Sequence, residues 1–269
     1  MPQPTDRNTV LGAGYIFFDR LVSGAYTGEL YIANTPDLAL AVEAGGNVTD
    51  YDADGPIATE LLNVDTQITR SLSFSAKHIT GNLWSLFLPG TLGSYSSSAG
   101  AVSDQPINGG TGVKQGYWYQ LGANLYPGGA RLVSSVAIKD SVPTTYTLTD
   151  DYLVDLVLGR VYIVPGGSIA DDTVITADFT EATASWESVA ATTLLEKVEG
   201  RFRFVSANTA GTERDVFVPS AILTPNGTIS LKSRTDVQMA GFNVRIQTPT
   251  ETLTDGTLLP PIVITGRAA

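Results

Sequence analysis

The chain has 269 residues, a length that can bury a sizeable core in one large β domain or in two smaller domains. It contains no cysteine and a single histidine, His78, which excludes disulfides, thiolate nucleophiles and metal sites built from cysteines or several histidines. The net charge of −11 is opposite in sign to that of a typical nucleic-acid binder, which must neutralise phosphates. The acidic surface either supplies solubility or faces DNA without adhering to it.

The N-terminal segment carries no sign of export or of a membrane anchor. Residues 1–6 lack the basic and apolar regions of a signal peptide, and no run of about 18 apolar residues follows. We therefore expect synthesis in a cytoplasm and no membrane span. Residues 1–11 are polar and contain two prolines, so we expect a flexible arm that becomes ordered only against a neighbour.

The segment from Gly12 to about residue 60 predicts strands followed by a long loop. Apolar residues recur with period 2 at Leu38, Leu40 and Val42, which is the spacing of a half-buried strand. Residues 44–60 are rich in Gly and Asp and predict an irregular connection, which at this length is usually functional or disordered.

This loop also invites a calcium interpretation, because Asp50, Asp52 and Asp54 match the front half of an EF-hand loop. The twelfth position holds Leu61 in place of the required glutamate, and no helical pattern flanks the loop, so the sequence favours an ordinary acidic loop.

A strand and one short helix are predicted next. Ile68, Leu72, Phe74 and Ala76 share one face of the strand. Thr80 is placed to cap a helix that ends at Pro89. The apolar side of this helix is expected to comprise Leu83, Trp84, Phe87 and Leu88.

The remaining chain predicts a second β unit inserted into the first. Residues 89–116 are rich in Ser and Gly and lack periodicity, which indicates a domain boundary. We expect residues 111–190 to form a small inserted β-sandwich, and residues 1–110 and 191–269 to form the main domain. Within the latter, residues 225–227 predict a tight hairpin turn. The fold class is thus mainly β, a sandwich or barrel with one short helix and a small inserted sandwich.

Catalytic chemistry finds little support. His78 ends a strand pattern, where a lone histidine is most often a packing or surface residue. Asp150-Asp151 and Asp171-Asp172 are adjacent pairs that would point to opposite faces of a strand, so they are better read as turn residues. Neither a nucleophile elbow nor a phosphate-binding loop is present. We expect no catalytic residue, no metal and no cofactor.

Two blocks of the chain resemble a known family in the order and spacing of their elements. The first block comprises Gly14–Arg20, Tyr31–Pro36, Leu38–Glu43 and Phe74–Leu88, and the second comprises Glu199–Val205 and Asp215–Pro219. These segments resemble the tail tube (major tail) proteins of long-tailed, siphovirus-like bacteriophages. Residues 110–190 depart from the minimal family pattern and look like an immunoglobulin-like insert.

The resemblance implies a structural virion protein that is not an enzyme and resides in the phage tail after synthesis in the host cytoplasm. Hexameric rings would stack head to tail into a hollow tube through which the genome is ejected. Implied partners are further copies of the chain, the tail terminator, the tail-tip or baseplate proteins, the tape measure protein and then viral DNA, with no membrane. The arm 1–11, the loop 44–60 and the tail after Thr248 would supply stacking contacts, and the tail would be non-contractile.

A run of acidic residues suggests which side chains would face the channel. Between Arg20 and Arg70 the chain has eight Asp or Glu residues and no Lys or Arg, which fits either a solvated face or a tube lumen that repels phosphate. The lumen-lining candidates are Glu29, Asp37, Glu43 and Asp50.

Two other functions compete with this interpretation. A monomeric carbohydrate-binding β-sandwich module could stack sugars on Tyr117 and Tyr119 or on Trp186, with strand alternation placing Trp118 on the opposite face from the two tyrosines. Another virion component, such as a decoration or tail-tip protein, is the structural alternative.

Overall fold

The computed structural model describes residues 9–52, 54, 56–142, 145–192 and 197–267. The fold is mainly β, as the sequence predicts, and the described residues contain one α-helix, α1 (Gly81–Phe87), and one 3-10 turn, η1 (Ile107–Gly110). The chain divides into two compact units, which are described separately. Unit 1 comprises residues 1–92 and 189–269, and unit 2 comprises residues 93–188.

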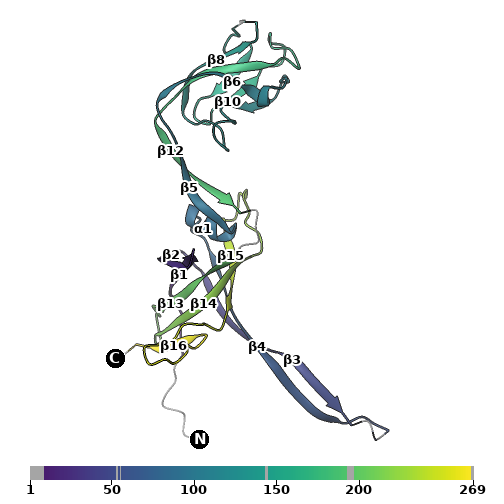
Figure 1. The fold of residues 1–269 in the computed structure, drawn as a ribbon, viewed down its shortest axis with the longest axis vertical. Coiled ribbons are helices and arrows are strands. Elements are labelled where there is room, and N and C mark those ends of the chain that lie inside the picture. Colours follow the sequence, from purple (N-terminus) through teal and green to yellow (C-terminus); the bar gives the residue numbers. More distant parts are fainter. Residues whose placement is uncertain (1–8, 53, 55, 143–144, 193–196, 268–269) are drawn as a thin grey trace. The chain divides into compact units, whose positions relative to one another are not determined.

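Unit 1 is built on one antiparallel sheet with the strand order β2-β1-β13-β14-β15-β4-β3, and β16 pairs in addition with β14 (Figure 1). Its strands are β1 (Gly14–Val22), β2 (Ala25–Ile32), β3 (Asp37–Tyr51), β4 (Glu60–Ala76), β13 (Val198–Ser206), β14 (Arg214–Asn226), β15 (Ala240–Ile246) and β16 (Val263–Gly266). In this order β2 and β3 are the two end strands, and each has one neighbour.

Alternation along these strands assembles the core of unit 1. In β1, Ile16 and Phe18 are buried while Tyr15, on the opposite face of the strand, is exposed, as expected for a sheet with one covered face. Buried phenylalanines from other strands meet there, and the ring centroids of Phe74 and Phe242 lie 5.2 Å apart. Gly200 permits the close approach of β1 and β13, because a Cβ at this position would lie 2.2 Å from the carbonyl oxygen of Asp19.

The predicted helix is confirmed. The Thr80 side chain accepts a hydrogen bond from the backbone N–H of Leu83 at 3.2 Å, which caps the first turn. Leu83 and Leu86 are buried, and the ring of Phe87 packs edge-on against Phe242 with centroids 5.9 Å apart. Leu88, predicted on the apolar side, is the C-cap residue and is exposed.

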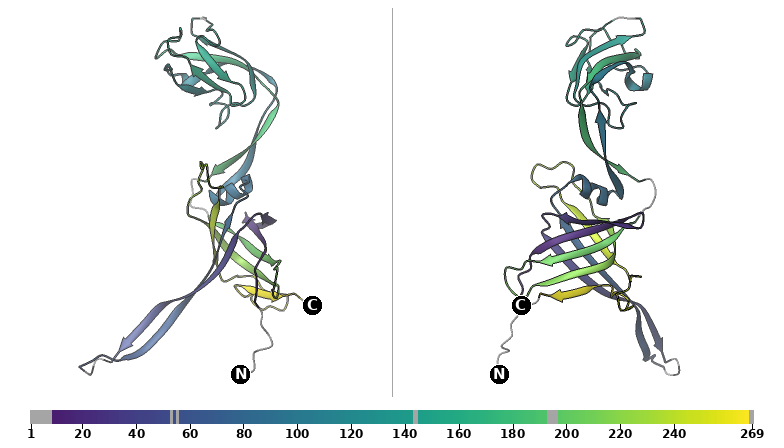
Figure 2. Two further views of the ribbon diagram at one scale, coloured as in Figure 1. Left: turned by 180° about the vertical axis from the view of Figure 1, so that it is seen from behind. Right: turned by 60° about the vertical axis from the view of Figure 1, so that its left-hand side comes forward.

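The predicted irregular loop over residues 44–60 is wrong for residues 44–51, which belong to β3, whereas the described residues between Tyr51 and Glu60 form no strand. Strands β3 and β4 pair continuously from Asp37–Ser75 to Asp50–Leu62, and form a long two-stranded hairpin that projects from the rest of unit 1 (Figures 1 and 2). Gly46 adopts a φ of 65°, and its carbonyl oxygen accepts a hydrogen bond from the Thr66 hydroxyl at 2.7 Å. Cross-strand pairing therefore continues through a Gly-rich, polar stretch whose composition suggests a loop.

Unit 2 is a two-sheet sandwich joined to a two-stranded ribbon. One sheet has the order β7-β10-β9 and the other β6-β11-β8, while β12 pairs with β5 in the ribbon. The strands are β5 (Gly90–Ser97), β6 (Gly100–Pro106), β7 (Trp118–Gln120), β8 (Val133–Asp140), β9 (Tyr152–Asp155), β10 (Arg160–Ile163), β11 (Ile175–Glu181) and β12 (Ala184–Ala191). Val161 and Ile163 of one sheet and Ile138 and Ile175 of the other are fully buried in a shared core.

The boundaries of unit 2 differ from the predicted ones. The structure places them at 92/93 and 188/189, whereas the sequence indicates 110/111 and 190/191. The first difference arises because the Ser- and Gly-rich stretch forms β5 and β6 and is not a linker. Small side chains leave no hydrophobic periodicity, yet the backbone can still pair with β12 and β11.

Both ends of the chain make contacts within unit 1. Residues 1–8 of the predicted arm lie outside the described residues, but Leu11 pairs with Ala210 through a hydrogen bond of 3.0 Å. The tail after Thr248, predicted to supply stacking contacts, returns to the sheet as β16. Arg267 then forms ion pairs with Glu213 and Asp215, and this hydrogen bonding holds the pKa of the Asp215 carboxyl below its usual value.

The predicted hairpin turn at residues 225–227 is also wrong. Strand β14 continues to Asn226 and its partner β15 begins only at Ala240, so residues 227–239 form a longer connection.

Asp151 of unit 2 provides a test of the sandwich. The buried Asp151 carboxylate accepts hydrogen bonds from the backbone N–H groups of Ser168 (2.6 Å) and Thr147 (2.8 Å), and these bonds lower its pKa. The ionised form therefore stabilises the fold above the unfolded-state pKa, and this contribution is lost as the pH falls through the lower folded-state pKa. We expect Asp151→Asn to destabilise the protein by about 1–3 kcal/mol at pH 7, because an amide N–H₂ then faces a backbone donor.

The measurement is denaturant unfolding between pH 7 and pH 3, with the exposed neighbour variant Asp150→Asn as control. The difference between Asp151→Asn and the wild type should shrink at the acid end. A difference that stays constant with pH would contradict the assigned role of the carboxylate.

Candidate functional site: an uncovered apolar face on the β3–β4 hairpin

The β3–β4 hairpin has two chemically different faces. Because side chains alternate along a strand and cross-strand partners share a face, the register assigns every residue to one of them. The even-numbered face carries the pairs Leu38–Phe74, Leu40–Leu72, Val42–Arg70, Ala44–Ile68, Val48–Val64 and Asp50–Leu62. The odd-numbered face carries Asp37–Ser75, Ala39–Ser73, Ala41–Ser71, Glu43–Thr69, Gly45–Gln67, Asn47–Asp65 and Thr49–Asn63. One face is therefore largely aliphatic and the other polar or small.

The aliphatic face begins in the core of unit 1 and then leaves it. Phe74 and Leu72 are 1% and 2% exposed, whereas Ile68, on the same face of the same strand, is 62% exposed. Val42, Val48, Leu62 and Val64 are exposed as well. We call these five residues, Val42, Val48, Leu62, Val64 and Ile68, the uncovered apolar face.

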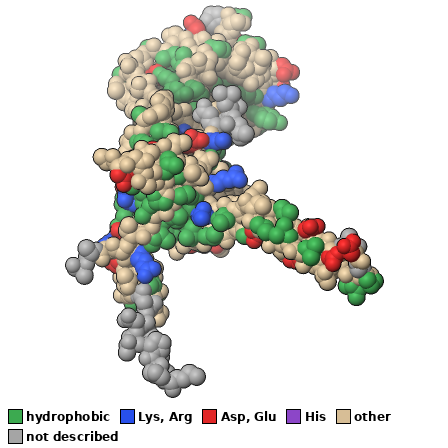
Figure 3. All heavy atoms as spheres, turned by 60° about the horizontal axis from the view of Figure 1, so that its bottom comes forward, with side chains coloured by type: hydrophobic (Ala, Val, Ile, Leu, Met, Phe, Trp, Pro, Cys, Tyr) green, Lys and Arg blue, Asp and Glu red, His purple; other side chains and the backbone are tan. Residues whose placement is uncertain are grey.

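Figure 3 shows hydrophobic side chains along the projecting hairpin, with acidic side chains gathered near its end. Exposed apolar residues that occur singly are ordinary, but several on one face that continues a core face, here interrupted by Arg70 and Thr66, make a candidate interaction surface. The outer part of the hairpin has only two strands, and such a ribbon is marginally stable in water without a covering layer.

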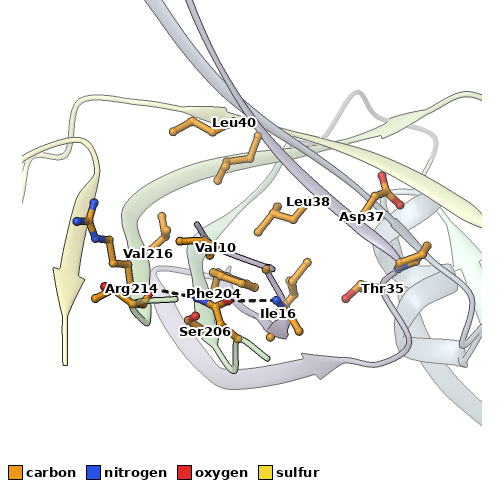
Figure 4. Close-up of a pocket in the computed structure, with 17 residues that line it drawn as sticks. Val10, Ile16, Thr35, Asp37, Leu38, Leu40, Phe204, Ser206, Arg214 and Val216 are labelled. Atoms are coloured by element: carbon orange, nitrogen blue, oxygen red, sulfur yellow. Dashed lines mark hydrogen bonds between the residues drawn. The ribbon is translucent and has the colours of Figure 1, made fainter. Parts of the chain in front are cut away.

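A pocket lies at the root of the hairpin. It has a volume of about 400 Å³ and is lined by residues of β1, β3, β4, β13 and β14 together with the segment before β1. Figure 4 shows Leu38 and Leu40 of β3 on one side and Val10, Phe204 and Val216 on the other. The lining is mostly apolar, and Asp37 and Arg214 are charged residues at its margin. The apolar surface of the hairpin thus continues into a hollow of the same character.

The end strands β2 and β3 of the sheet leave backbone groups on their outer edges without a strand partner among the described residues. Natural proteins usually protect such edges, because free N–H and C=O groups pair readily with another strand. The two edges belong to different strands of one chain. A contact between them in two copies would therefore join unlike surfaces.

The predicted lumen-lining residues are not brought together. Asp37 and Glu43 share the polar face of β3, while Asp50 lies on the opposite face near the end of the hairpin. Glu29 belongs to β2, where its carboxylate forms an ion pair with Arg203 at 2.6 Å. Asp37 accepts a hydrogen bond from the Ser75 hydroxyl at 3.3 Å. Glu43 is exposed.

The other sequence candidates gain little support. Asp50 accepts a hydrogen bond from the backbone N–H of Tyr51, and Asp52 accepts one from that of Asp54. Among the residues that the structure describes, no group of three or more Asp, Glu, His or Cys is arranged to hold a metal ion. His78 is exposed and lines a small pocket with Tyr31 and Thr80, and its described lining includes no carboxylate. In the described part of the chain no helix is long and apolar enough to cross a membrane.

The aromatic candidates for sugar binding are rearranged. Tyr119 is half-buried against the unit 2 core, and its hydroxyl accepts a hydrogen bond from the backbone N–H of Lys114. Trp186 packs against Tyr126, with ring centroids 5.2 Å apart. Tyr117 is exposed, and so is Trp118, which alternation places on the other face from Tyr119 as the sequence predicts.

Comparison with known protein families gives one match. The family described as "Protein of unknown function UCP028589" matches residues 9–219. The chain belongs to this family. The matched region contains the whole β3–β4 hairpin and all of unit 2, so both features fall within what the UCP028589 family model describes. No curated protein matches the chain in sequence.

The uncovered apolar face is the feature that sequence reasoning missed. The period-2 pattern at Leu62, Val64, Ile68 and Leu72 carried the signal on β4, but the polar Thr66 interrupts it. On β3 the consecutive Gly45 and Gly46 and the following polar residues concealed the continuation of the strand. Pairing β3 with β4 in register reveals the shared face.

Unfolding measurements can test whether this face is uncovered in a single chain. We expect Ile68→Ala to change the free energy of unfolding of the dilute protein by no more than about 0.5 kcal/mol, because an exposed side chain loses little on truncation. The matched variant Leu72→Ala, four residues further in on the same face, should cost about 2–5 kcal/mol. Equal costs for the two variants would mean that Ile68 is already buried in the free protein.

Proposed function

We propose that this protein is a structural subunit that assembles with further copies of itself into closed rings, and that these rings form the tail tube of a long-tailed bacteriophage. The observation that carries the proposal is the uncovered apolar face of the β3–β4 hairpin. Ring formation, the number of copies and the phage context rest on the resemblance of the two sequence blocks to tail tube proteins. The mainly β fold and the inserted second unit are compatible with it.

The energetics favour association through this face. Burying an aliphatic side chain of this size fully contributes about 1.5–3 kcal/mol relative to leaving it exposed. Bringing two proteins together costs roughly 4–15 kcal/mol before any contact is made. The five side chains are about half exposed, so each would contribute roughly half of this value, and together they can offset the lower part of this cost. A hairpin with both faces polar would gain nothing from a neighbour.

The partner is inferred to be another copy of the chain. The same unit 1 that exposes the hairpin also holds an apolar pocket at its root and two unlike free sheet edges. Contacts between unlike surfaces of identical chains are heterologous, and they generate a ring when the rotation closes and a filament when it does not. A ring also removes the free edges, because each β2 or β3 edge meets a neighbour.

The polar face of the hairpin would then be available to line a channel. It carries Asp37, Glu43 and Asp65 and has no Lys or Arg between residues 37 and 69. Repetition around a ring turns each carboxylate into a belt of negative charge. Such belts repel phosphate at close range, while screening at physiological salt weakens them beyond about 8–10 Å. DNA would pass without adhering.

The assembly is tested by comparing two adjacent residues on opposite faces. We expect the purified wild-type protein to form rings or tubes of constant bore in negative-stain images. Val64→Asp places a charge on the uncovered apolar face and should abolish assembly, because burying an unpaired carboxylate costs several kcal/mol. Asn63→Asp introduces the same charge on the polar face and should leave assembly intact.

Circular dichroism and thermal unfolding serve as the folding control for both variants. A wild-type protein that stays monomeric at high concentration would refute the proposal. Rings formed equally well by Val64→Asp would show that another surface joins the copies.

The channel is tested separately with assembled particles. Glu43→Lys should leave assembly intact but make the particles retain short double-stranded DNA, by about tenfold or more over wild type at low salt, with retention lost as salt rises. Glu187→Lys makes the same charge change in unit 2 and is the control. Equal retention by both variants would count against Glu43 facing the bore.

A further inference from the structure

The outer face of the β7-β10-β9 sheet in unit 2 carries an exposed aromatic surface. The register aligns Trp118, Tyr162 and Leu153 across the three strands, on the opposite side from the buried Val161. Trp118 is 45% exposed, and its ring centroid lies 5.2 Å from that of Tyr162 with the planes tilted by 42°. These side chains contribute nothing to the sandwich core, which lies on the other side of the sheet.

A guanidinium group lies beside these rings without a polar partner. The Cζ of Arg160 is 5.3 Å from the centre of the Trp118 ring, which is a cation–π contact. Within the described residues, the Arg160 side chain takes part in no hydrogen bond and no ion pair. Stacking on the indole therefore orients the guanidinium while its N–H donors stay available.

The two cross-strand neighbours of Arg160 direct side-chain atoms to the backbone of a nearby turn. Asp155 lies directly across from Arg160 in the register, but its Oδ1 accepts the backbone N–H groups of Val157 (3.1 Å) and Leu158 (2.9 Å). On the other side, the Gln120 side-chain amide donates to the carbonyl oxygens of Leu158 and Gly159, each at 2.9 Å. Both cross-strand partners thus stabilise the turn after β9, and the guanidinium remains free.

An oriented guanidinium beside exposed rings matches the chemistry of an acidic sugar. One face of a pyranose ring presents C–H groups, which pack on aromatic rings, and a carboxylate on the sugar accepts the paired N–H donors of arginine. Nucleic acid fits less well, because it needs a basic groove that follows many phosphates. We propose that Trp118, Tyr162 and Arg160 form a binding site for a carboxylate-bearing glycan, of the hexuronic acid class.

This site is independent of the proposed self-assembly, since it lies in unit 2 and the uncovered apolar face lies in unit 1. It also differs from the sugar platform expected from the sequence, which named Tyr117 with Tyr119 or Trp186. In the structure Trp118 points outward and Tyr119 lies against the core. The ring exposed on this sheet face is therefore Trp118, which the sequence placed on the face opposite the expected platform.

The test is a titration of the full-length protein with trigalacturonate, followed by calorimetry, with the methyl ester of the same trisaccharide as the uncharged comparison. We expect the ester to bind about tenfold or more weakly, because it keeps the rings but loses the carboxylates. Arg160→Ala should weaken binding of the acid to the level of the ester, and Lys232→Ala, which removes an exposed positive charge in unit 1, should not. Trp118→Ala should weaken the binding of both ligands. Thermal unfolding that matches that of Arg160→Ala serves as the folding control for this variant.

Three outcomes would overturn the proposal. The first is an absence of trigalacturonate binding by the wild type up to about 10 mM, which corresponds to a negligible affinity. The second is equal binding of the acid by wild type and Arg160→Ala. The third is preferential binding of an oligothymidine, which would assign the surface to nucleic acid.

Discussion

Strand alternation in the β3–β4 hairpin is the constraint on which the account of this protein depends. A single register from Asp37–Ser75 to Asp50–Leu62 places aliphatic side chains on one face and small or polar ones on the other. Near the sheet that aliphatic face supplies Leu72 and Phe74 to the core, and further out its aliphatic side chains are exposed. A shift by one residue would exchange the two faces, so the register also determines which residues are left exposed.

The rest of unit 1 is consistent with a subunit completed by its neighbours. The phenylalanine core, the capped helix α1 and the ion pairs of Arg267 make a stable base for the hairpin. The end strands β2 and β3 and the apolar pocket at the hairpin root remain open. Open edges and an uncovered apolar face are liabilities in a monomer, but they become contact surfaces in a closed ring.

Much of the fold was predictable from the sequence, since its signals are local. The helix followed from Thr80 and the apolar spacing after it, and the core face of β4 followed from Leu72, Phe74 and Ala76. The hairpin was not predictable in the same way, because Gly45, Gly46 and the acids near its end have the composition of a loop. Their strand conformation comes from pairing with residues about twenty positions away, which no local pattern records.

The candidate sites were likewise only partly predictable from the sequence. The acids Glu29, Asp37, Glu43 and Asp50 were selected as a run of like charge, yet the register separates Asp50 from Asp37 and Glu43, and Arg203 partly neutralises Glu29. Alternation alone placed Trp118 on the opposite face from Tyr119, but it did not decide which of these two faces points outward. The lack of a polar partner for Arg160 was not predictable from the sequence. It depends on how Asp155 and Gln120 form hydrogen bonds with the backbone of a neighbouring turn.

The most direct test of the central claim uses the absence of cysteine from the chain. Single substitutions Val64→Cys and Asn63→Cys place one thiol on each face of the hairpin, and the rate of thiol labelling reports its exposure at different protein concentrations. The account predicts that labelling at position 64 slows sharply as the concentration rises while labelling at position 63 continues. Equal labelling rates at both positions, unchanged at every concentration, would contradict it, because the apolar face would then stay in water without a partner.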